Sequence, residues 1–283
     1  MGVFVGLLAA LLFGSGDFFG GRASRDASTR SVLVVSQTTA AIGAVVLALL
    51  VSGEVIGADL TYGAAAGLAN ALGLGMLYRG LATGRMGVVA PVTAVVGALV
   101  PVTWGLVVGE RPAALVLAGV ACAVLAGALI SRERETDRTE AHDPAASKAV
   151  LIALVAGAAL GTSFVLFAYT SDVSGLWPVL AARTSAMLAA LIAARWIATG
   201  ERKRLPRPAA RLAIAAGACD VSATAFLLVG IRNELAVVVA PIASLAPGFT
   251  VLWAWSLLRE PLGRTQSIGL VLALVGLAMI AGG

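Results

Sequence analysis

The sequence predicts an all-α integral membrane protein with ten transmembrane helices, arranged as two inverted five-helix repeats. Three observations predict this fold. Only 12% of the 283 residues are charged and 59% are hydrophobic, whereas a soluble domain carries roughly 25% charged residues. The apolar stretches run about twenty residues, the length that crosses a hydrocarbon core of roughly 30 Å. The second half of the chain also repeats features of the first half.

Each apolar stretch is expected to be a helix, because backbone groups inside the hydrocarbon core have no water to bond. The 33 glycines favour close helix packing in lipid. Pro91, Pro241 and Pro247 should kink the fourth and ninth spans, and the carbonyls that they free are tolerated where they line a cavity. The ten expected spans are 2–20, 32–52, 60–79, 87–108, 113–130, 149–170, 176–198, 209–230, 234–257 and 266–282.

One connection differs from the others in composition. Residues 131–148 read SRERETDRTEAHDPAASK, which is highly charged and has no apolar periodicity. Such a segment cannot bury enough apolar surface to fold alone, so we expect a flexible cytoplasmic linker. The sequence therefore divides into a first repeat over 1–130, this linker, and a second repeat over 149–283.

The repeat is visible at a spacing of 150 residues. The pairs at this spacing are the Val-Val-Ala-Pro blocks at 88–91 and 238–241, Glu110 and Glu260, Gly119 and Gly269, and Asn70 and Asp220. Because each half holds five spans, the second half must enter the membrane with the opposite orientation. Inverted repeats of this kind recur in secondary transporters, with the substrate site near the midplane between the repeats.

In the same regions the sequence resembles the EamA-type transporters of the drug/metabolite transporter superfamily. The first half carries the Val-Val-Ala-Pro block followed by Gly109-Glu110-Arg111-Pro112 and Gly119, and the second half carries the block followed by Arg259-Glu260-Pro261 and Gly269. The resemblance covers essentially the whole chain. It implies a ten-helix, multi-pass protein of the cell membrane that moves a small organic metabolite or drug, often outward, by alternating access. It does not identify the solute.

The basic residues indicate an orientation. The connections after spans 1, 3, 5, 7 and 9 hold sixteen Lys and Arg residues, and the opposite connections hold two, Arg111 and Arg232. The positive-inside rule then places both termini outside the cell. The resemblance implies the reverse, with both termini inside, so the absolute topology stays open, as does the oligomeric state.

Ionisable groups at membrane depth are costly, so each needs a reason. Asp220 lies in the middle of span 8, where it is either a proton-coupling site or counter-charge for a cationic substrate, or a structural partner of Asn70 or Arg183. Arg183 in span 7 could bind a substrate carboxylate, extend to the interface, or pair with Asp220. Asp17, near the end of span 1, is expected to pair with Arg22 or Arg25.

Neutral polar residues extend this candidate set. A cavity between spans 1, 4, 6 and 9 is one position for them, and helix-packing contacts are the other, since hydroxyl groups commonly bond between helices in lipid. These residues are Ser15, Thr93, Ser163, Tyr169 and Ser244.

Other classes of function lack their signals. Gly14-Ser15-Gly16-Asp17 resembles the G-x-G-D motif of intramembrane aspartyl proteases, but Cys219 stands where that family has a tyrosine before the partner aspartate. No metalloprotease, serine-hydrolase or P-loop motif is present, so we expect neither an enzyme nor a bound metal or cofactor. The net charge of +5 comes from the connections and does not indicate nucleic-acid binding. A passive channel or facilitator is the alternative to a carrier.

Overall fold

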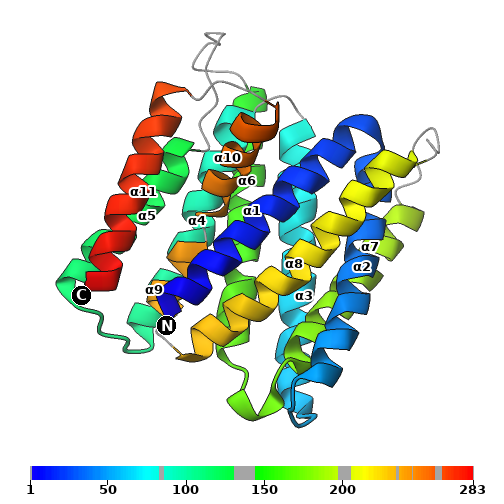
Figure 1. Cartoon of the computed structure of the whole chain (residues 1–283), viewed down its shortest axis with the longest axis horizontal. Helices are drawn as coiled ribbons and strands as arrows, with labels where there is room; N and C mark the ends of the chain where they lie inside the picture. Colours follow the sequence, from blue (N-terminus) through cyan, green and yellow to red (C-terminus); the bar gives the residue numbers. More distant parts are fainter. Residues whose placement is uncertain are drawn as a thin grey trace.

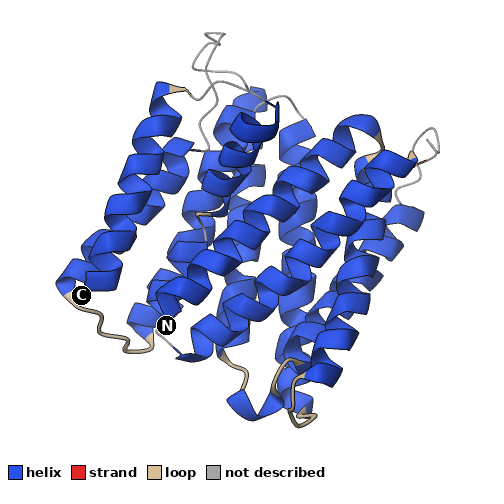
Figure 2. Cartoon of the chain, in the orientation of Figure 1, coloured by secondary structure: helices blue, strands red, loops and turns tan. Residues whose placement is uncertain are grey.

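The protein is helical throughout the part that the structure describes. The computed structural model describes residues 2–82, 86–130, 144–196, 205–233, 236–243, 245–258 and 263–282, and the regular structure in these ranges is helix without strands (Figure 2). This confirms the all-α prediction. The helices are α1 Gly2–Asp26, α2 Thr29–Leu50, α3 Gly57–Ala82, α4 Met86–Val107, α5 Ala114–Ile130, α6 Pro144–Ala168, the short η1 Asp172–Ser174, α7 Trp177–Trp196, α8 Arg207–Asn233, α9 Ala236–Ala243, α10 Ala246–Leu258 and α11 Arg264–Gly282.

Membrane-spanning helices account for most of this architecture. Within the described ranges, seven helical segments are long and apolar enough to cross a membrane by length and composition. Three shorter apolar helices accompany them, at Val92–Val107, Ala114–Leu129 and Arg264–Ile280. Several helices run a turn or more beyond the predicted spans, because helical hydrogen bonding continues into polar residues. The helix α1, for example, ends at Asp26 rather than near residue 20.

The predicted ninth span is two helices. Pro241 lies inside α9 and is fully buried, and Pro247 is the second residue of α10. Proline removes an interior hydrogen bond from α9 but fits the first turn of α10, where its missing N–H has no helical partner. Between the two helices, the Leu245 amide donates to the Ile242 carbonyl and the Gly248 amide donates to the Leu245 carbonyl. The break therefore falls between the two prolines.

Two other sequence predictions meet the structure only in part. Residues 131–143 of the expected linker lie outside the described residues, whereas Pro144–Lys148 form the first turn of α6 instead of extending the linker. Pro91 lies within α4, but its side chain is outside the described set.

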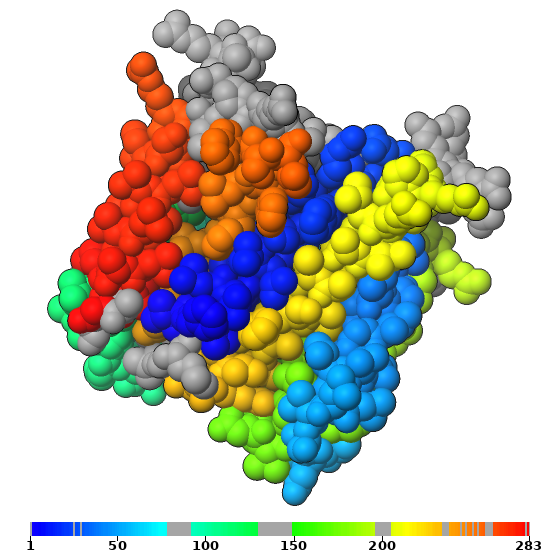
Figure 3. Space-filling view, viewed as in Figure 1, coloured from blue at the N-terminus to red at the C-terminus, as the bar shows by residue number. Residues whose placement is uncertain are grey.

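The helices form two layers (Figure 1). One layer contains α10, α1, α8 and α2, and the other contains α4, α6, α3 and α7, as their packing contacts show. Helices α2 and α7 pack against each other across the layers, α9 packs against both α4 and α1, and α5 packs against α11. In the space-filling view, α1 and α8 lie side by side across the face that is seen (Figure 3).

Glycines set how closely several helices approach. Gly67 of α3 faces the Ala182 carbonyl of α7, and Gly217 of α8 faces the Ser36 carbonyl of α2, with no room for a Cβ atom at either glycine. Small residues of this kind let helix backbones approach in lipid, where dispersion contacts replace the hydrophobic effect. Both chain termini lie on one side of the bundle, which we call the terminal side (Figure 1).

Candidate functional site

A buried ion pair joins α7 to α8. Arg183 Nη1 lies 2.5 Å from Asp220 Oδ2, with side-chain exposures of 3% and 17%. Arg183 Nη2 donates to Thr224 Oγ1, and the Thr224 hydroxyl donates to the Asp220 carbonyl at 2.9 Å. Of the alternatives that the sequence left open, the structure therefore brings Asp220 to Arg183. Its position between two helices allows both a structural role and a role in binding charge.

An amide from α2 completes this cluster. Gln37 Nε2 lies 3.5 Å from Asp220 Oδ2, and the side chain is buried. Gln37 Oε1 and Arg183 Nε are buried and have no hydrogen-bond partner in the described structure. Buried polar atoms without partners are uncommon and point to a missing ligand, water or conformational state.

Asn70 does not bond to Asp220. It is buried on α3, one turn after Gly67, which packs against α7. Its Oδ1 atom has no hydrogen-bond partner among the described residues. Asn70 therefore borders the helix pair that carries Arg183 and offers an unused acceptor.

Asp17 lies beside the ion pair instead of pairing with Arg22. Gly16 packs where α1 crosses α8, because a Cβ atom there would be 3.5 Å from Cys219 Cβ and 3.8 Å from the Asp220 amide nitrogen. Asp17 follows Gly16 directly, so it belongs to the stretch of α1 that crosses α8 at Asp220. The Asp17 side chain is exposed.

The expected pairing of Asp17 with Arg22 is wrong, because Arg22 donates to Asp26 one helical turn away, at 3.0 Å. A surface pair at this spacing forms within a single helix. The side chain of Arg25, the other expected partner, is outside the described set.

The neutral candidates are not brought together. Ser15 accepts from Trp253 Nε1 at 2.8 Å and links α1 to α10, and Thr93 donates to the Ala153 carbonyl at 3.3 Å and links α4 to α6. Ser163 is buried within α6. Ser244 lies outside the described residues.

Tyr169 belongs to an aromatic group beyond the end of α6. Its ring stacks on Tyr62 at 5.3 Å between centroids and meets Trp104 edge-on at 5.5 Å. Trp104 Nε1 also donates to the Tyr169 hydroxyl at 3.1 Å. These contacts join α3, α4 and the end of α6, and Tyr169 itself is half exposed.

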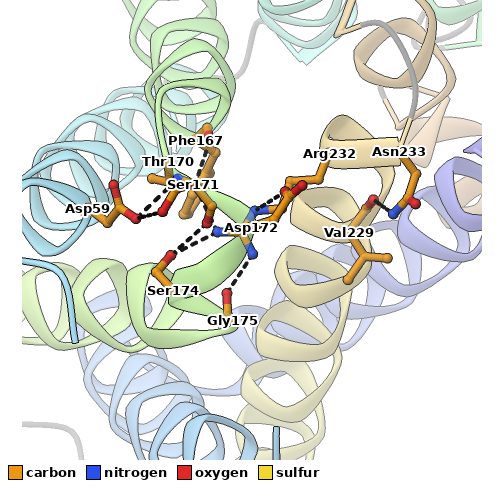
Figure 4. Close-up of polar contacts among 10 residues, drawn as sticks. All are labelled: Asp59, Phe167, Thr170, Ser171, Asp172, Ser174, Gly175, Val229, Arg232 and Asn233. Carbon is orange, nitrogen blue, oxygen red and sulfur yellow. Dashed lines mark hydrogen bonds and ion pairs between the residues drawn. The ribbon is translucent and has the colours of Figure 1, made fainter. Parts of the chain in front are cut away.

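A second polar group lies on the terminal side (Figure 4). Arg232 of α8 donates to the Gly175 carbonyl at 2.7 Å, to Ser174 Oγ at 3.0 Å and to Thr170 Oγ1 at 3.1 Å. It also lies 3.5 Å from Asp172. These bonds join the end of α8 to the connection between α6 and α7.

Comparison with known proteins gives the family. Residues 147–282 match the EamA-like transporter family. That stretch is slightly less than half of the chain, and it is the part that resembles the family. No curated protein matches the sequence. A solved structure titled "Crystal structure of protein" has a TM-score of 0.80 and 13% identity, and it covers 99% of this chain and 98% of that chain. At that identity the likeness shows the fold alone.

Members of the matched family are membrane transporters of small molecules, and the apolar helices of this chain fit a multi-pass membrane protein. The matched half contains Arg183, Asp220 and Arg232. The arginine of the ion-pair cluster and the arginine of the cluster on the terminal side both lie in the half that matches the family.

Sequence reasoning missed several members of these groups. Gln37 and Thr224 were not singled out, although a lone amide in an apolar span is a signal that could have found Gln37. Arg232 was noted only as one of two basic residues on its side of the membrane. Asp59 sits in the first turn of α3, where a carboxylate has an ordinary role at a helix N-terminus.

Proposed function

We propose that this protein is a secondary transporter that moves a small organic solute by alternating access between two inverted five-helix repeats. The repeat is supported by matching contacts in the two halves. Gly67 and Gly217 are 150 residues apart, and the residues whose carbonyls they face, Ala182 and Ser36, are 146 residues apart. The contact of α3 with α7 thus has a counterpart in the contact of α8 with α2, which is what exchange of the two halves requires.

The charge balance near Asp220 supports a site for a positive charge. Two carboxylates, Asp17 and Asp220, belong to the stretches of α1 and α8 that cross at Gly16, and Arg183 pairs with Asp220. Cys219 is the other titratable group beside them. The three charged groups together carry a net charge of −1, which favours a proton or a substrate ammonium group at membrane depth. This imbalance is the observation that carries the proposal.

Proton coupling is then assigned to Asp17. Asp220 Oδ2 already accepts from Arg183 and lies within reach of the Gln37 amide, so its charge has partners in the protein. Asp17 is the carboxylate left without such a partner in the described structure. We infer that Asp17 releases a proton when solute binds and takes one up when the empty carrier returns.

The distribution of basic residues supports an orientation in the membrane, and the family supports a direction of transport. Arg22, Arg30, Arg207 and Arg211 lie near helix ends on the side opposite the termini. The positive-inside rule puts that side in the cytoplasm of a cell-membrane protein. Export, the direction that is common in the family, would carry solute from that side to the terminal side.

The test begins with the solute. Metabolites inside and outside cells with and without the protein are compared by mass spectrometry, and the compound that changes most is then assayed in proteoliposomes. We expect saturable flux that rises with an imposed pH gradient, and we expect Asp17→Asn to remove the dependence on that gradient. Asp26→Asn, which alters an exposed surface pair of the same helix, is the matched control.

Two outcomes would reject parts of this proposal. Flux that rises linearly with solute concentration would identify a passive facilitator. Saturable flux in Asp17→Asn with the full dependence on the pH gradient would remove Asp17 from the coupling step and leave the carrier intact.

A further inference from the structure

The terminal side of the bundle holds a buried cation with an unusual set of partners. Arg232 is only 10% exposed, although it lies in the last turn of α8 near the end of the membrane span. Three of its hydrogen bonds go to neutral groups of residues 170–175, and its ion pair is with Asp172, whose side chain is 78% exposed. Figure 4 shows these groups converging on the guanidinium.

The same connection is also bound by α3. Asp59 Oδ2 accepts from the Ser171 amide at 3.1 Å and from the Ser171 hydroxyl at 2.5 Å. Asp59 is 5% exposed and lies in the first turn of α3. Residues 170–175 are therefore fixed from two directions, by a cation from α8 and by a carboxylate from α3.

Backbone contacts tighten this arrangement. The Glu54 amide donates to the Val173 carbonyl at 2.8 Å, and Trp177 Nε1 donates to the Gly53 carbonyl at 3.2 Å. Gly175 has a φ of +51°, and a Cβ atom there would lie 2.7 Å from the Ser52 carbonyl oxygen. Only glycine combines this backbone conformation with so close a contact. The connection between α2 and α3 thus packs against the connection between α6 and α7.

The helices that meet here belong to different layers. Helices α3 and α6 lie in one layer, and α8 lies in the other. Arg232 is thus bonded across the boundary between the two layers, each of which holds helices of both repeats, and this side opens only if the layers part. Its bonds go mostly to hydroxyl and carbonyl groups next to an exposed carboxylate, so water can replace them when the layers part.

We propose that Asp59, residues 170–175 and Arg232 form a latch that closes the terminal side and opens once in each transport cycle. This inference rests on the proposed carrier function. Arg232 closes the latch by bonding across the layers, and Asp59 keeps residues 170–175 attached to their own layer. Loss of the Arg232 bonds shifts the population towards the state that is open on the terminal side.

Hydrogen–deuterium exchange of the full chain in lipid nanodiscs tests the latch without any substrate. In Arg232→Gln, we expect peptides over residues 169–176 to exchange about tenfold faster, because bonds to a charged donor contribute more than neutral ones. Peptides over residues 20–32 and 205–212, on the opposite side, should exchange more slowly, because opening one side of a carrier closes the other. Thr170→Val removes a single acceptor and should show the same pattern at smaller size.

Asn233→Ala is the matched control, because Asn233 is exposed and its amide donates only within its own helix, to the Val229 carbonyl at 2.7 Å. It should leave both sides unchanged. Faster exchange at 169–176 with no response on the opposite side would overturn the latch and identify a simple loop anchor, as would no change at 169–176. Such a result leaves the carrier proposal standing if wild-type flux is saturable, whereas linear wild-type flux rejects the carrier whatever the exchange shows.

Discussion

The two halves of the chain carry different chemistry at corresponding positions. In the second half, Arg183 and Asp220 form a buried ion pair. In the first half, Gln37 stands 146 residues before Arg183 and Asn70 stands 150 residues before Asp220, the spacings that relate the glycine contacts of the two halves. Neutral amides in one half thus occupy the positions that charged residues occupy in the other.

This difference separates the scaffold from the site. Close helix contacts at Gly67 and Gly217 are common to both halves because any pair of helices can use them. A buried ion pair adds little net stability, since desolvation offsets the attraction between its charges. The pair in one half alone is therefore better explained by binding than by folding, and three sets of variants test that interpretation.

The largest effect is expected from breaking the ion pair. Arg183→Leu leaves the Asp220 carboxylate without its cation, which should lower the free energy of unfolding by about 3–5 kcal/mol. Arg183→Gln combined with Asp220→Asn gives the second half the amides of the first, so it should recover most of that stability while solute flux is lost. Denaturant unfolding in detergent and flux in proteoliposomes measure the two quantities. Full flux in the double variant would show that the asymmetry has no role in transport.

A smaller effect is expected at the shared glycine contacts. Gly67→Ala and Gly217→Ala each place a methyl group against a backbone carbonyl of the neighbouring helix, which should destabilise the fold by about 1–3 kcal/mol. Gly75→Ala in the same helix as Gly67 meets nothing within 4 Å, so it should be neutral or slightly stabilising. The midpoint temperature of thermal unfolding, compared between each variant and the wild type, measures these changes in stability. A large loss at Gly67 with none at Gly217 would argue against equivalent halves.

The smallest effect on stability is expected at the neutral amides. Asn70→Leu removes an acceptor that has no partner, so the free energy of unfolding should change by less than about 1 kcal/mol. If solute uses that acceptor, the KM should rise roughly fivefold, the equivalent of one neutral hydrogen bond. An unchanged KM would show that solute does not use Asn70, which leaves Arg183, Asp220 and Gln37 as the candidate binding residues.

Much of the fold could be predicted because membrane helices obey a simple rule. Lipid forces apolar segments of twenty residues into helices, so their number, type and approximate limits follow from hydropathy. The predicted helix ends are least accurate where a helix continues past the apolar stretch: α1 ends at Asp26 and α6 begins at Pro144. The break between α9 and α10 was expected only as a kink, because two prolines do not reveal where the helical hydrogen bonding ends.

Of the residues in the candidate site, only the charged ones could be predicted from the sequence. Asp220 and Arg183 stand out because charge at membrane depth is rare, and their pairing was one of several alternatives. Thr224 does not stand out, since single hydroxyl groups are common in membrane helices, whereas the lone amide of Gln37 is a signal that could have been used. Arg232 and Asp59 lie near span ends, where charge is ordinary, so nothing in the sequence indicated that residues 170–175 join them.

By itself, the sequence determined that the chain is a helical membrane protein with a transporter's family signature, because composition and apolar length are local properties that lipid converts directly into helices. Tertiary structure alone decided which helices share a layer, that Asp17 lies beside Asp220, and that Arg232 bonds across the bundle. Those outcomes depend on contacts between residues far apart in the chain, for example Ser15 and Trp253, which are 238 positions apart. In lipid such contacts are selected by close packing and by satisfying polar groups, which hydropathy along the chain does not encode.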